Sequence, residues 1–291
     1  MARKIRLSPL DRGFNIVCYT IVVLFSLIVL LPFWTLIMDS FSGDVANLGA
    51  RFWIKSFTLK AWQDVLSRDN LARYYGNTLF VTIVGTLFTV TTTYLAAYPL
   101  SKRNMPFNRT ITYLMLFTMY FGGGLIPTYL LYKDLGLHDN LWVMILPHMF
   151  SAYYILVMRN FLTDNLVELE ESAKLDGAND YVIAFRIFLP LAKPIIATIA
   201  LWSAVGQWNA WYAPMIYITT PSKQVMQVIL RRMLIDAQLA ALFDDGVNEI
   251  RVSEDSVKAV SILITILPII CTYPFAQKYF IRGLTSGAVK G

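Results

Sequence analysis

The chain has 291 residues, of which 56% are hydrophobic and 15% are charged, and its mean hydropathy is +0.53. A soluble domain typically carries about 25% charged residues, so this composition excludes an ordinary soluble protein. The charged residues are clustered and leave long uncharged stretches, which is typical of membrane-spanning helices. The formal net charge of +6 therefore indicates membrane topology rather than binding to nucleic acid.

The N-terminus carries Arg3, Lys4, Arg6 and Arg12 ahead of an apolar stretch that begins at Phe14. That stretch is longer than the core of a signal peptide, and no small-residue cleavage site closes it. We therefore expect a retained first membrane span.

Six long apolar stretches predict an all-α integral membrane protein with six transmembrane helices. The expected spans cover residues 14–38, 77–100, 110–132, 141–161, 195–217 and 256–275. Six spans place both termini on one side of the membrane. Basic segments at both ends and after the second span favour the cytoplasmic side.

The third span is interrupted by Gly122, Gly123, Gly124 and Pro127. Two interpretations remain open. The helix is broken there, which membranes tolerate only where protein or a cavity shields the backbone, or the glycines form a close packing contact.

Two connections carry helical patterns of their own. Residues 39–76 mix aromatic side chains with charges of both signs, which predicts a short amphipathic helix at the membrane interface. Spaced apolar residues within 219–255 predict a second amphipathic helix.

The expected spans lack the acidic residues of ion-coupled transporters, and the chain lacks common metal-binding and phosphate-binding motifs. No Asp or Glu lies in the interior of any expected span, which weakens the hypothesis of an ion-coupled transporter. His148 is interpreted as a packing or interfacial residue, and Cys18 and Cys271 as small buried hydrophobic residues rather than disulfide partners or metal ligands. No phosphate-binding loop of the G-x-x-x-x-G-K-[ST] type occurs, and no cofactor or metal site is expected on this chain.

A polar stretch from Glu168 to Pro190 lies between the fourth and fifth spans. Asn165 and Glu168 form a plausible capping box for a first helix, and Glu170 with Lys174 is a favourable i, i+4 pair. Gly177 is expected to stop that helix. Asn179 or Asp180 then caps a second helix that ends at Leu189-Pro190. The residues alone leave open whether this helix, turn and helix is a simple connector or a docking element.

The spacing of this stretch resembles the EAA loop of permeases from ATP-binding-cassette (ABC) importers. That loop has the pattern E-A-A, three residues, G, nine residues, I-x-L-P, and this chain has Glu171-Ser172-Ala173, Gly177 and Ile187-x-Leu189-Pro190, with Ser172 replacing an alanine. The tail from Gly283 to Gly291 also resembles that of the MalG-like sugar permeases, in particular those that carry oligosaccharides and polysaccharide fragments. The resemblance covers essentially the whole chain.

The resemblance implies a fold of the type I ABC importer permease with a cytoplasmic coupling helix. The implied organisation is a cytoplasmic arm over residues 1–13, the first span and its outer connection over 14–72, the permease core over 73–280 and a cytoplasmic tail over 281–291. Within the core, 164–190 is the coupling loop and 219–255 the outer loop. The residues expected to couple to an ATPase are Leu166, Leu169, Glu171, Ser172, Ala173, Asp176, Gly177, Ala178, Ile187, Leu189 and Pro190.

The same resemblance implies partners in the bacterial inner membrane. They are a sister permease chain, two ATPase subunits that hold ATP and Mg, and an extracytoplasmic solute-binding protein. The chain itself would be a transporter subunit rather than an enzyme. The alternatives are an ion-coupled secondary sugar transporter and a structural membrane subunit without a pathway of its own.

The residues most suggestive of a substrate pathway combine amides with aromatic rings, which suit sugar hydroxyls and sugar rings. They are Gln207, Trp208, Asn209, Trp211 and Tyr212. The alternative is that the aromatics belong to an interfacial belt and that the amides join helices. An acidic oligosaccharide, such as a fragment of alginate or pectin, is the substrate hypothesis.

Overall fold

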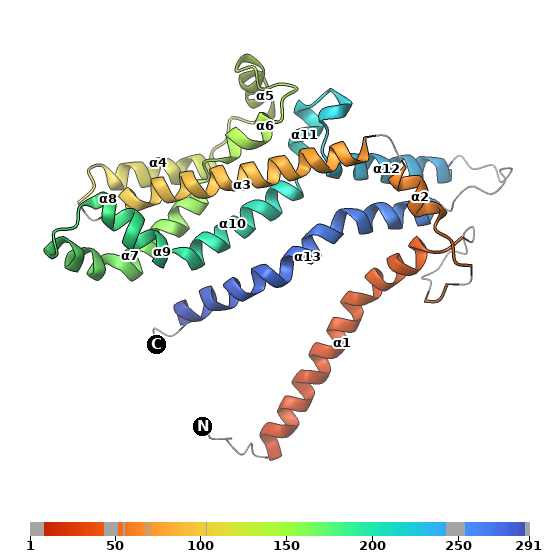
Figure 1. The fold of residues 1–291 in the computed structure, drawn as a ribbon, viewed down its shortest axis with the longest axis horizontal. Helices are drawn as coiled ribbons and strands as arrows, with labels where there is room; N and C mark the ends of the chain where they lie inside the picture. Colours follow the sequence, from red (N-terminus) through yellow and green to blue (C-terminus); the bar gives the residue numbers. More distant parts are fainter. Residues whose placement is uncertain are drawn as a thin grey trace. The chain divides into compact units, whose positions relative to one another are not determined.

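The computed structural model describes residues 9–43, 52–54, 56–67, 70–102, 104–242 and 254–288, of which the side chains of 9, 165–168, 236–242, 254 and 273–288 are not described. The ordered elements in these ranges are helices, apart from one isolated bridge between Ser42 and Phe57 (Figure 1). The predicted all-α fold is therefore confirmed. The chain divides into two compact units, residues 1–68 with 233–264 and residues 69–232 with 265–291.

The first unit contains α1 (Pro9–Ser40), α2 (Lys60–Leu66) and the start of α13 (Glu254–Ala288). The side chains of α1 are mostly exposed although they are apolar, which is the pattern of a helix surrounded by lipid. Its small core joins Ala61, Val65 and Val260. The predicted short helix of residues 39–76 is α2.

The second unit is organised along α3 (Leu71–Ser101), against which α7 (Ala152–Leu175) and α10 (Lys193–Trp208) pack (Figure 1). Small residues of α3 face the contact, since Gly85 and Thr89 are buried. A Cβ added at Gly85 would lie 3.0 Å from Nε2 of Gln207 on α10. The close approach of these two helices therefore depends on a residue without a side chain.

Two hydrophobic clusters fill the second unit. One lies toward the end of α3 and contains the buried residues Tyr94, Met158, Leu162, Phe188 and Ile199. The other lies toward its middle and contains Val81, Val143, Ile145, Tyr217 and Val228. Each cluster collects residues far apart in the sequence, so α3 forms a common wall for both.

Three helices are straight, long and apolar enough to cross a membrane, over Leu10–Ser40, Leu71–Ser101 and Asp255–Thr272. Three further candidates are pairs of helices bent at a short break, which gives up to six spans and agrees with the predicted number. The free cysteine Cys18 is half-buried and Cys271 is exposed. The prediction that both thiols are buried within the chain was therefore wrong for Cys271.

The glycines of the third expected span break the helix. α4 (Asn108–Tyr120) and α5 (Leu125–Asp134) meet at 111°, and Gly124 has a φ of +84°. No atom lies within 4 Å of a Cβ built at Gly122 or Gly124. Of the two interpretations left open by the sequence, the described residues of this chain therefore support the broken helix.

The other two bends separate short helical pieces from long helices. α6 (Trp142–Ile145) and the 3-10 helix η1 (Leu146–His148) precede α7 with a bend of 43°. α8 (Asp180–Val182), the π-helix η2 (Ile183–Phe188) and α9 (Leu189–Leu191) precede α10 with a bend of 72°.

The remaining helices are α11 (Tyr212–Tyr217), the 3-10 turn η3 (Pro221–Lys223) and α12 (Met226–Leu242). α12 is the amphipathic helix predicted within 219–255. Residues 243–253 of that segment lie outside the described residues, as do residues 1–8 of the predicted arm and 289–291 of the predicted tail.

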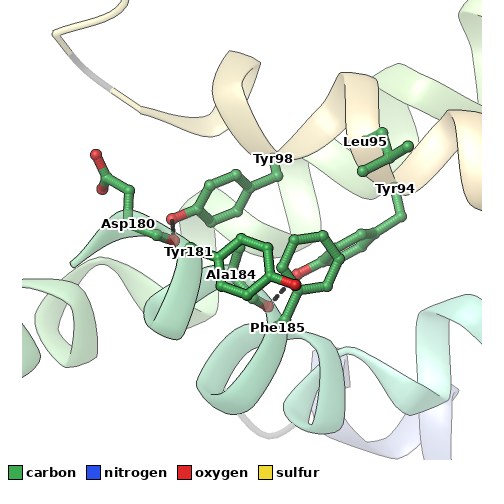
Figure 2. Close-up of a pocket in the computed structure, with 7 residues that line it drawn as sticks. All are labelled: Tyr94, Leu95, Tyr98, Asp180, Tyr181, Ala184 and Phe185. Atoms are coloured by element: carbon green, nitrogen blue, oxygen red, sulfur yellow. Dashed lines mark hydrogen bonds between the residues drawn. The ribbon is translucent and has the colours of Figure 1, made fainter. Parts of the chain in front are cut away.

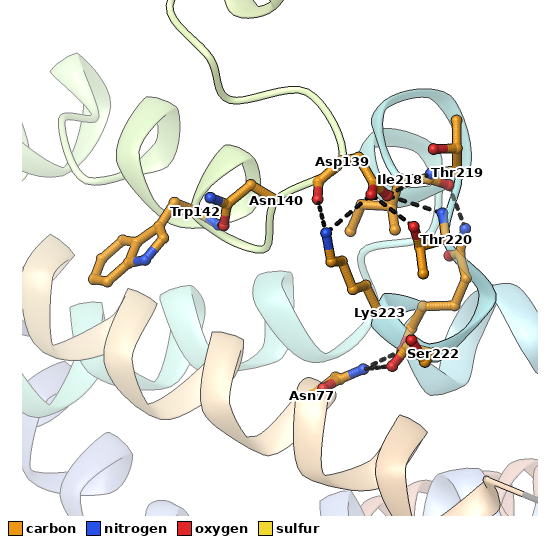
Figure 3. Close-up of polar contacts among 10 residues, drawn as sticks. Asn77, Asp139, Asn140, Trp142, Ile218, Thr219, Thr220, Ser222 and Lys223 are labelled. Carbon is orange, nitrogen blue, oxygen red and sulfur yellow. Dashed lines mark hydrogen bonds and ion pairs between the residues drawn. The ribbon is translucent and has the colours of Figure 1, made fainter.

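A polar contact joins the loop before α6 to the loop after α11, and we call it the Asp139 clasp (Figure 3). Oδ1 of Asp139 accepts hydrogen bonds from the backbone N–H groups of Thr219 (3.0 Å) and Thr220 (2.8 Å). Oδ2 accepts from the Thr220 hydroxyl (2.7 Å) and from Nζ of Lys223 (2.9 Å). Asn77 of α3 adds hydrogen bonds from its side-chain amide to the carbonyls of Ser222 (3.0 Å) and Gln224 (2.9 Å).

These bonds favour the charged carboxylate, so the hydrogen bonds from Thr220 and Lys223 hold the pKa of Asp139 well below its usual range. Because the pKa of Asp139 is lowered on folding, its stabilisation is complete above the unfolded pKa of about 4 and is lost as the pH falls through the folded pKa. At neutral pH the clasp is therefore at full strength.

Asp139→Asn is expected to lower the free energy of unfolding at neutral pH by about 1–3 kcal/mol. The amide nitrogen of asparagine is a donor, so it cannot accept the hydrogen bonds that one carboxylate oxygen of Asp139 accepts. Thermal unfolding of the purified protein measures the loss, which should shrink as the pH approaches 3. Asp134→Asn is the control, since Asp134 is exposed on the same connection. Equal losses in the two variants, or a loss that does not change with pH, would contradict this account of the clasp.

Candidate functional site

The polar segment of residues 164–190 begins inside a helix. α7 runs without interruption from Ala152 to Leu175, so the fourth expected span and the first helix of the segment are one element. The prediction that a new helix starts at a capping box of Asn165 and Glu168 was wrong, because the backbone there is already helical. The fourth expected span therefore continues into the polar segment without a break.

The turn after α7 has the predicted glycine conformation. Gly177 has a φ of +81°, the backbone N–H of Ala178 donates to the carbonyl of Ala173 (2.9 Å), and that of Gly177 donates to Lys174 (3.1 Å). These are the two hydrogen bonds of a Schellman motif, in which glycine avoids the strain of positive φ. The Asn179 side chain then caps α8 by accepting from the N–H of Val182 (2.9 Å).

The second helix of the segment contains a π-helical turn and ends later than predicted. Helical backbone continues past Leu189-Pro190 to Leu191, and the direction changes at Ala192 before α10. Proline does not end the helix because it occupies the first turn of α9, where no intrahelical N–H is required. In the π-turn the Ala184 carbonyl accepts from both the Leu189 N–H and the Tyr94 hydroxyl (2.5 Å).

Tyr94 and Tyr98 of α3 cover this second helix (Figure 2). The Tyr98 hydroxyl donates to the carbonyl of Asp180 (3.0 Å). Together with Leu95, Tyr181 and Phe185 the two tyrosines border a pocket of about 260 Å³. The aromatic contacts attach the second helix to α3.

An ion-pair group, which we call the Lys102 brace, joins α3 to both helices of the segment. Nζ of Lys102 lies 2.9 Å from Oε1 of Glu170 on α7 and also contacts Oδ1 of Asp180 on α8. Nζ of Lys174 lies 2.6 Å from the same Glu170 oxygen, which is the predicted i, i+4 pair. Lys102 and Glu170 are 18% and 13% exposed, so solvent screens this pair less than a surface pair.

The pKa values in the brace follow its contacts. Burial lowers the pKa of Lys102, but hydrogen bonds to Asp180, Tyr98 and Glu170 outweigh it and raise that pKa. Burial raises the pKa of Glu170, but hydrogen bonds from Lys174 and Lys102 outweigh it and lower that pKa. Both side chains are therefore charged at neutral pH.

The residues of the segment predicted to face a partner differ in exposure. Glu171, Ser172, Asp176, Gly177 and Pro190 are exposed, whereas Ala178, Ile187 and Leu189 are partly buried. Leu169 is 44% exposed, but Ala173 is 8% exposed and packs in the core, so the two do not form one free apolar face. The prediction that Ala173 is available to a partner was therefore wrong, and the side chain of Leu166 lies outside the described residues.

Two apolar side chains beside the turn escaped the sequence analysis. Leu175 is 89% exposed and Tyr181 is 72% exposed. The resemblance to the EAA loop pointed to Leu166, Leu169 and Ala173 and did not include Leu175 or Tyr181. These two side chains flank Gly177 and enlarge the exposed apolar surface of the turn.

A second candidate site lies where α10 ends, and we call it the Gln207 pocket. Its volume is about 230 Å³. Gln207, Asn209, Trp211 and Tyr212 from the predicted substrate cluster line it together with Met144, His148, Ala210 and Ala213. The structure therefore brings four of the five predicted residues together and adds His148, which the sequence suggested only as a packing residue.

The side chains of this pocket are held by backbone groups. Nε2 of Gln207 donates to the Met144 carbonyl (3.2 Å), and Nδ2 of Asn209 donates to the Val205 carbonyl (2.9 Å). Trp208 does not line the pocket: it is 5% exposed, and its Nε1 donates to the Thr265 carbonyl (3.2 Å). The assignment of Trp208 to the pathway was wrong because its ring packs between helices.

Known proteins are similar to this chain in sequence and in structure. No protein-family model matches the chain. Protein LplC of Bacillus subtilis is 40% identical over 266 residues, which cover 91% of this chain and 90% of LplC. The polygalacturonan/rhamnogalacturonan transport system permease protein YtcP of B. subtilis is 35% identical over 287 residues, covering 97% and 99%. The chain belongs to the permeases of ABC sugar importers.

Structural similarity agrees with this family. The permease matches a crystal structure of a bacterial ABC transporter involved in the import of the acidic polysaccharide alginate, with a TM-score of 0.81, 31% identity, and coverage of 95% of this chain and 100% of that chain. The permease is thus a multi-pass membrane subunit of an importer that depends on a binding protein. The alternative of an ion-coupled secondary transporter is not supported.

Replacing Lys102 tests the brace in the permease. Lys102→Met keeps the apolar stem but leaves Glu170 and Asp180 without the shared ammonium. We therefore expect the free energy of unfolding to fall by about 1–3 kcal/mol. Hydrogen exchange of the backbone amides of 180–188 should become faster. Lys174→Met is the matched control, because Lys174 is 52% exposed and its pair with Glu170 is worth at most about 1 kcal/mol. Equal effects of the two substitutions would show that Lys102 does not join the helices.

Proposed function

We propose that this permease imports oligosaccharides that contain uronic acids, and that an ATPase drives it through residues 164–190. The relatives support the substrate class, because YtcP carries the name of a polygalacturonan/rhamnogalacturonan system and the matched crystal structure belongs to an alginate importer. All three polymers contain uronic acids. The proposal extends that chemistry to this chain.

The observation that carries the coupling proposal is the Lys102 brace. An ATPase that moves the exposed turn at Gly177 moves α7 directly, since α7 is one continuous helix. The same movement reaches α3 through the contacts of Lys102 with Glu170 and Asp180. One contact at the turn therefore acts on two spans, as a rigid-body transition between inward- and outward-open states requires.

The docking surface that we propose is the exposed part of the segment. Leu175 and Tyr181 offer apolar area, while Glu171 and Asp176 offer carboxylates to donors on the partner. The partly buried Ile187 and Leu189 support this surface from behind.

The proposed assembly follows from the family. Two ATPase subunits with ATP and Mg bind at the segments of this chain and of a sister permease, and a solute-binding protein delivers the sugar on the opposite face. Both termini of this chain then lie in the cytoplasm, with the segment. Energy comes from ATP on a separate chain.

Gly177→Val tests the coupling role. Valine at a φ of +81° costs about 1–2 kcal/mol and distorts the turn. The complete importer should lose transport and sugar-stimulated ATP hydrolysis while the permease still folds, as size-exclusion chromatography and circular dichroism would show.

Gly136→Val provides the matched control. Gly136 has a φ of +70° with no atom within 4 Å of its Cβ position, so the backbone cost is the same outside residues 164–190. We expect this variant to transport. Gly177→Asn, which tolerates positive φ better, should recover part of the activity. Normal transport by Gly177→Val would refute the coupling role of this turn.

A further inference from the structure

We propose that Arg231 gives the Gln207 pocket its preference for the carboxylate of an acidic sugar residue. This inference rests on the proposed function and assigns the acid selectivity to one side chain of this permease. Arg231 does not itself line the pocket, and its contact with the lining residue Trp211 connects it to the pocket.

Arg231 lies in α12 and stacks on a residue that lines the pocket. Its guanidinium carbon is 3.9 Å from the centre of the Trp211 ring, which is cation–π geometry. A guanidinium stacked on an indole face is held in place over the ring, and its N–H groups stay available at its own rim. These N–H groups remain able to donate to a carboxylate beside Trp211.

The charge of Arg231 is not neutralised by the described part of the chain. Among the side chains that the structure describes, no carboxylate lies within 4 Å of Arg231, whereas Lys102, Lys174 and Lys223 each contact at least one. The pocket lining holds no acidic residue either. A sugar carboxylate entering the pocket therefore meets an available cation and no like charge.

The remaining lining suits one ring of an oligosaccharide. The rings of Trp211 and Tyr212 offer faces for a sugar ring. The side-chain nitrogens of Gln207 and Asn209 donate to backbone carbonyls, so their amide oxygens are left to accept hydrogen bonds from sugar hydroxyls. A volume of about 230 Å³ is below the roughly 300–1,000 Å³ of pockets for drug-sized ligands. The pocket therefore takes a single uronate ring of a longer chain.

The Arg231 guanidinium and a sugar carboxylate in the pocket are expected to make a bidentate contact. Two parallel N–H groups of a guanidinium match the two oxygens of a carboxylate, and this pairing is among the strongest hydrogen-bonded contacts in proteins. Methyl esterification of the sugar removes the charge and one acceptor while it keeps the ring and its hydroxyls. The ester is therefore the matched probe for Arg231.

The experiment measures uptake by the complete importer in proteoliposomes, with saturating binding protein loaded with trigalacturonate or with its methyl ester. Arg231→Gln should lower the rate for trigalacturonate about tenfold, the effect expected for one charge-assisted hydrogen-bond pair, and leave the rate for the ester unchanged. The rate for trigalacturonate in Arg231→Lys should lie between the rates of the unmodified importer and of Arg231→Gln, because lysine keeps the charge but lacks two parallel N–H groups. Arg232→Gln is the control, since Arg232 is the adjacent exposed arginine.

The outcomes separate this inference from the function on which it rests. An equal loss for both sugars in Arg231→Gln, or no loss for either, overturns the role of Arg231 while import of acidic sugars stands. Failure of the unmodified importer to transport trigalacturonate overturns the proposed substrate and the inference with it. Basal ATP hydrolysis by each variant confirms that the complex is assembled.

Discussion

One lysine joins three helices of this permease. The ammonium of Lys102, at the end of α3, contacts carboxylates from two different helices of residues 164–190. Since both Lys102 and Glu170 are largely buried, separating them would leave charges in a poorly solvated place. The segment is therefore fastened to the membrane-embedded helices by charge as well as by the Tyr94 and Tyr98 contacts.

Backbone hydrogen bonding explains why the helices break where they do. Polar backbone groups at membrane depth need partners inside the protein. At the π-turn of η2 the Ala184 carbonyl accepts from the Leu189 N–H and the Tyr94 hydroxyl, and near η1 the Thr89 hydroxyl donates to the His148 carbonyl (3.3 Å). Tyr94 and Thr89 of α3 thus supply hydrogen bonds to the π-turn and to the break that follows η1.

The sequence predicted features that depend on neighbours along the chain. The number of apolar stretches, the positive φ of Gly177, the Asn179 cap and the Glu170–Lys174 pair each depend on local spacing, and each agrees with the structure. The errors concern tertiary context. Trp208 has the same composition cue as Trp211 but turns toward Thr265. Ala173 shares a helical face with Leu169, yet the packing of that face against the core cannot be read from periodicity. Arg231 lies 20 positions from Trp211 in sequence, so no local pattern connects them.

The missing side chain of Gly85 has a mechanical consequence. Gly85 lets α10 approach α3 closely enough for Gln207 to lie against its backbone, and Gln207 lines the Gln207 pocket together with Trp211 and Tyr212. Lys102 is 17 residues further along α3, or about 25 Å at about 1.5 Å per residue. A small tilt of α3 about its Lys102 end would displace Gly85 and the Gln207 side chain packed against it much further than Lys102 itself. The helix therefore has the geometry of a lever whose long arm ends at the Gln207 pocket.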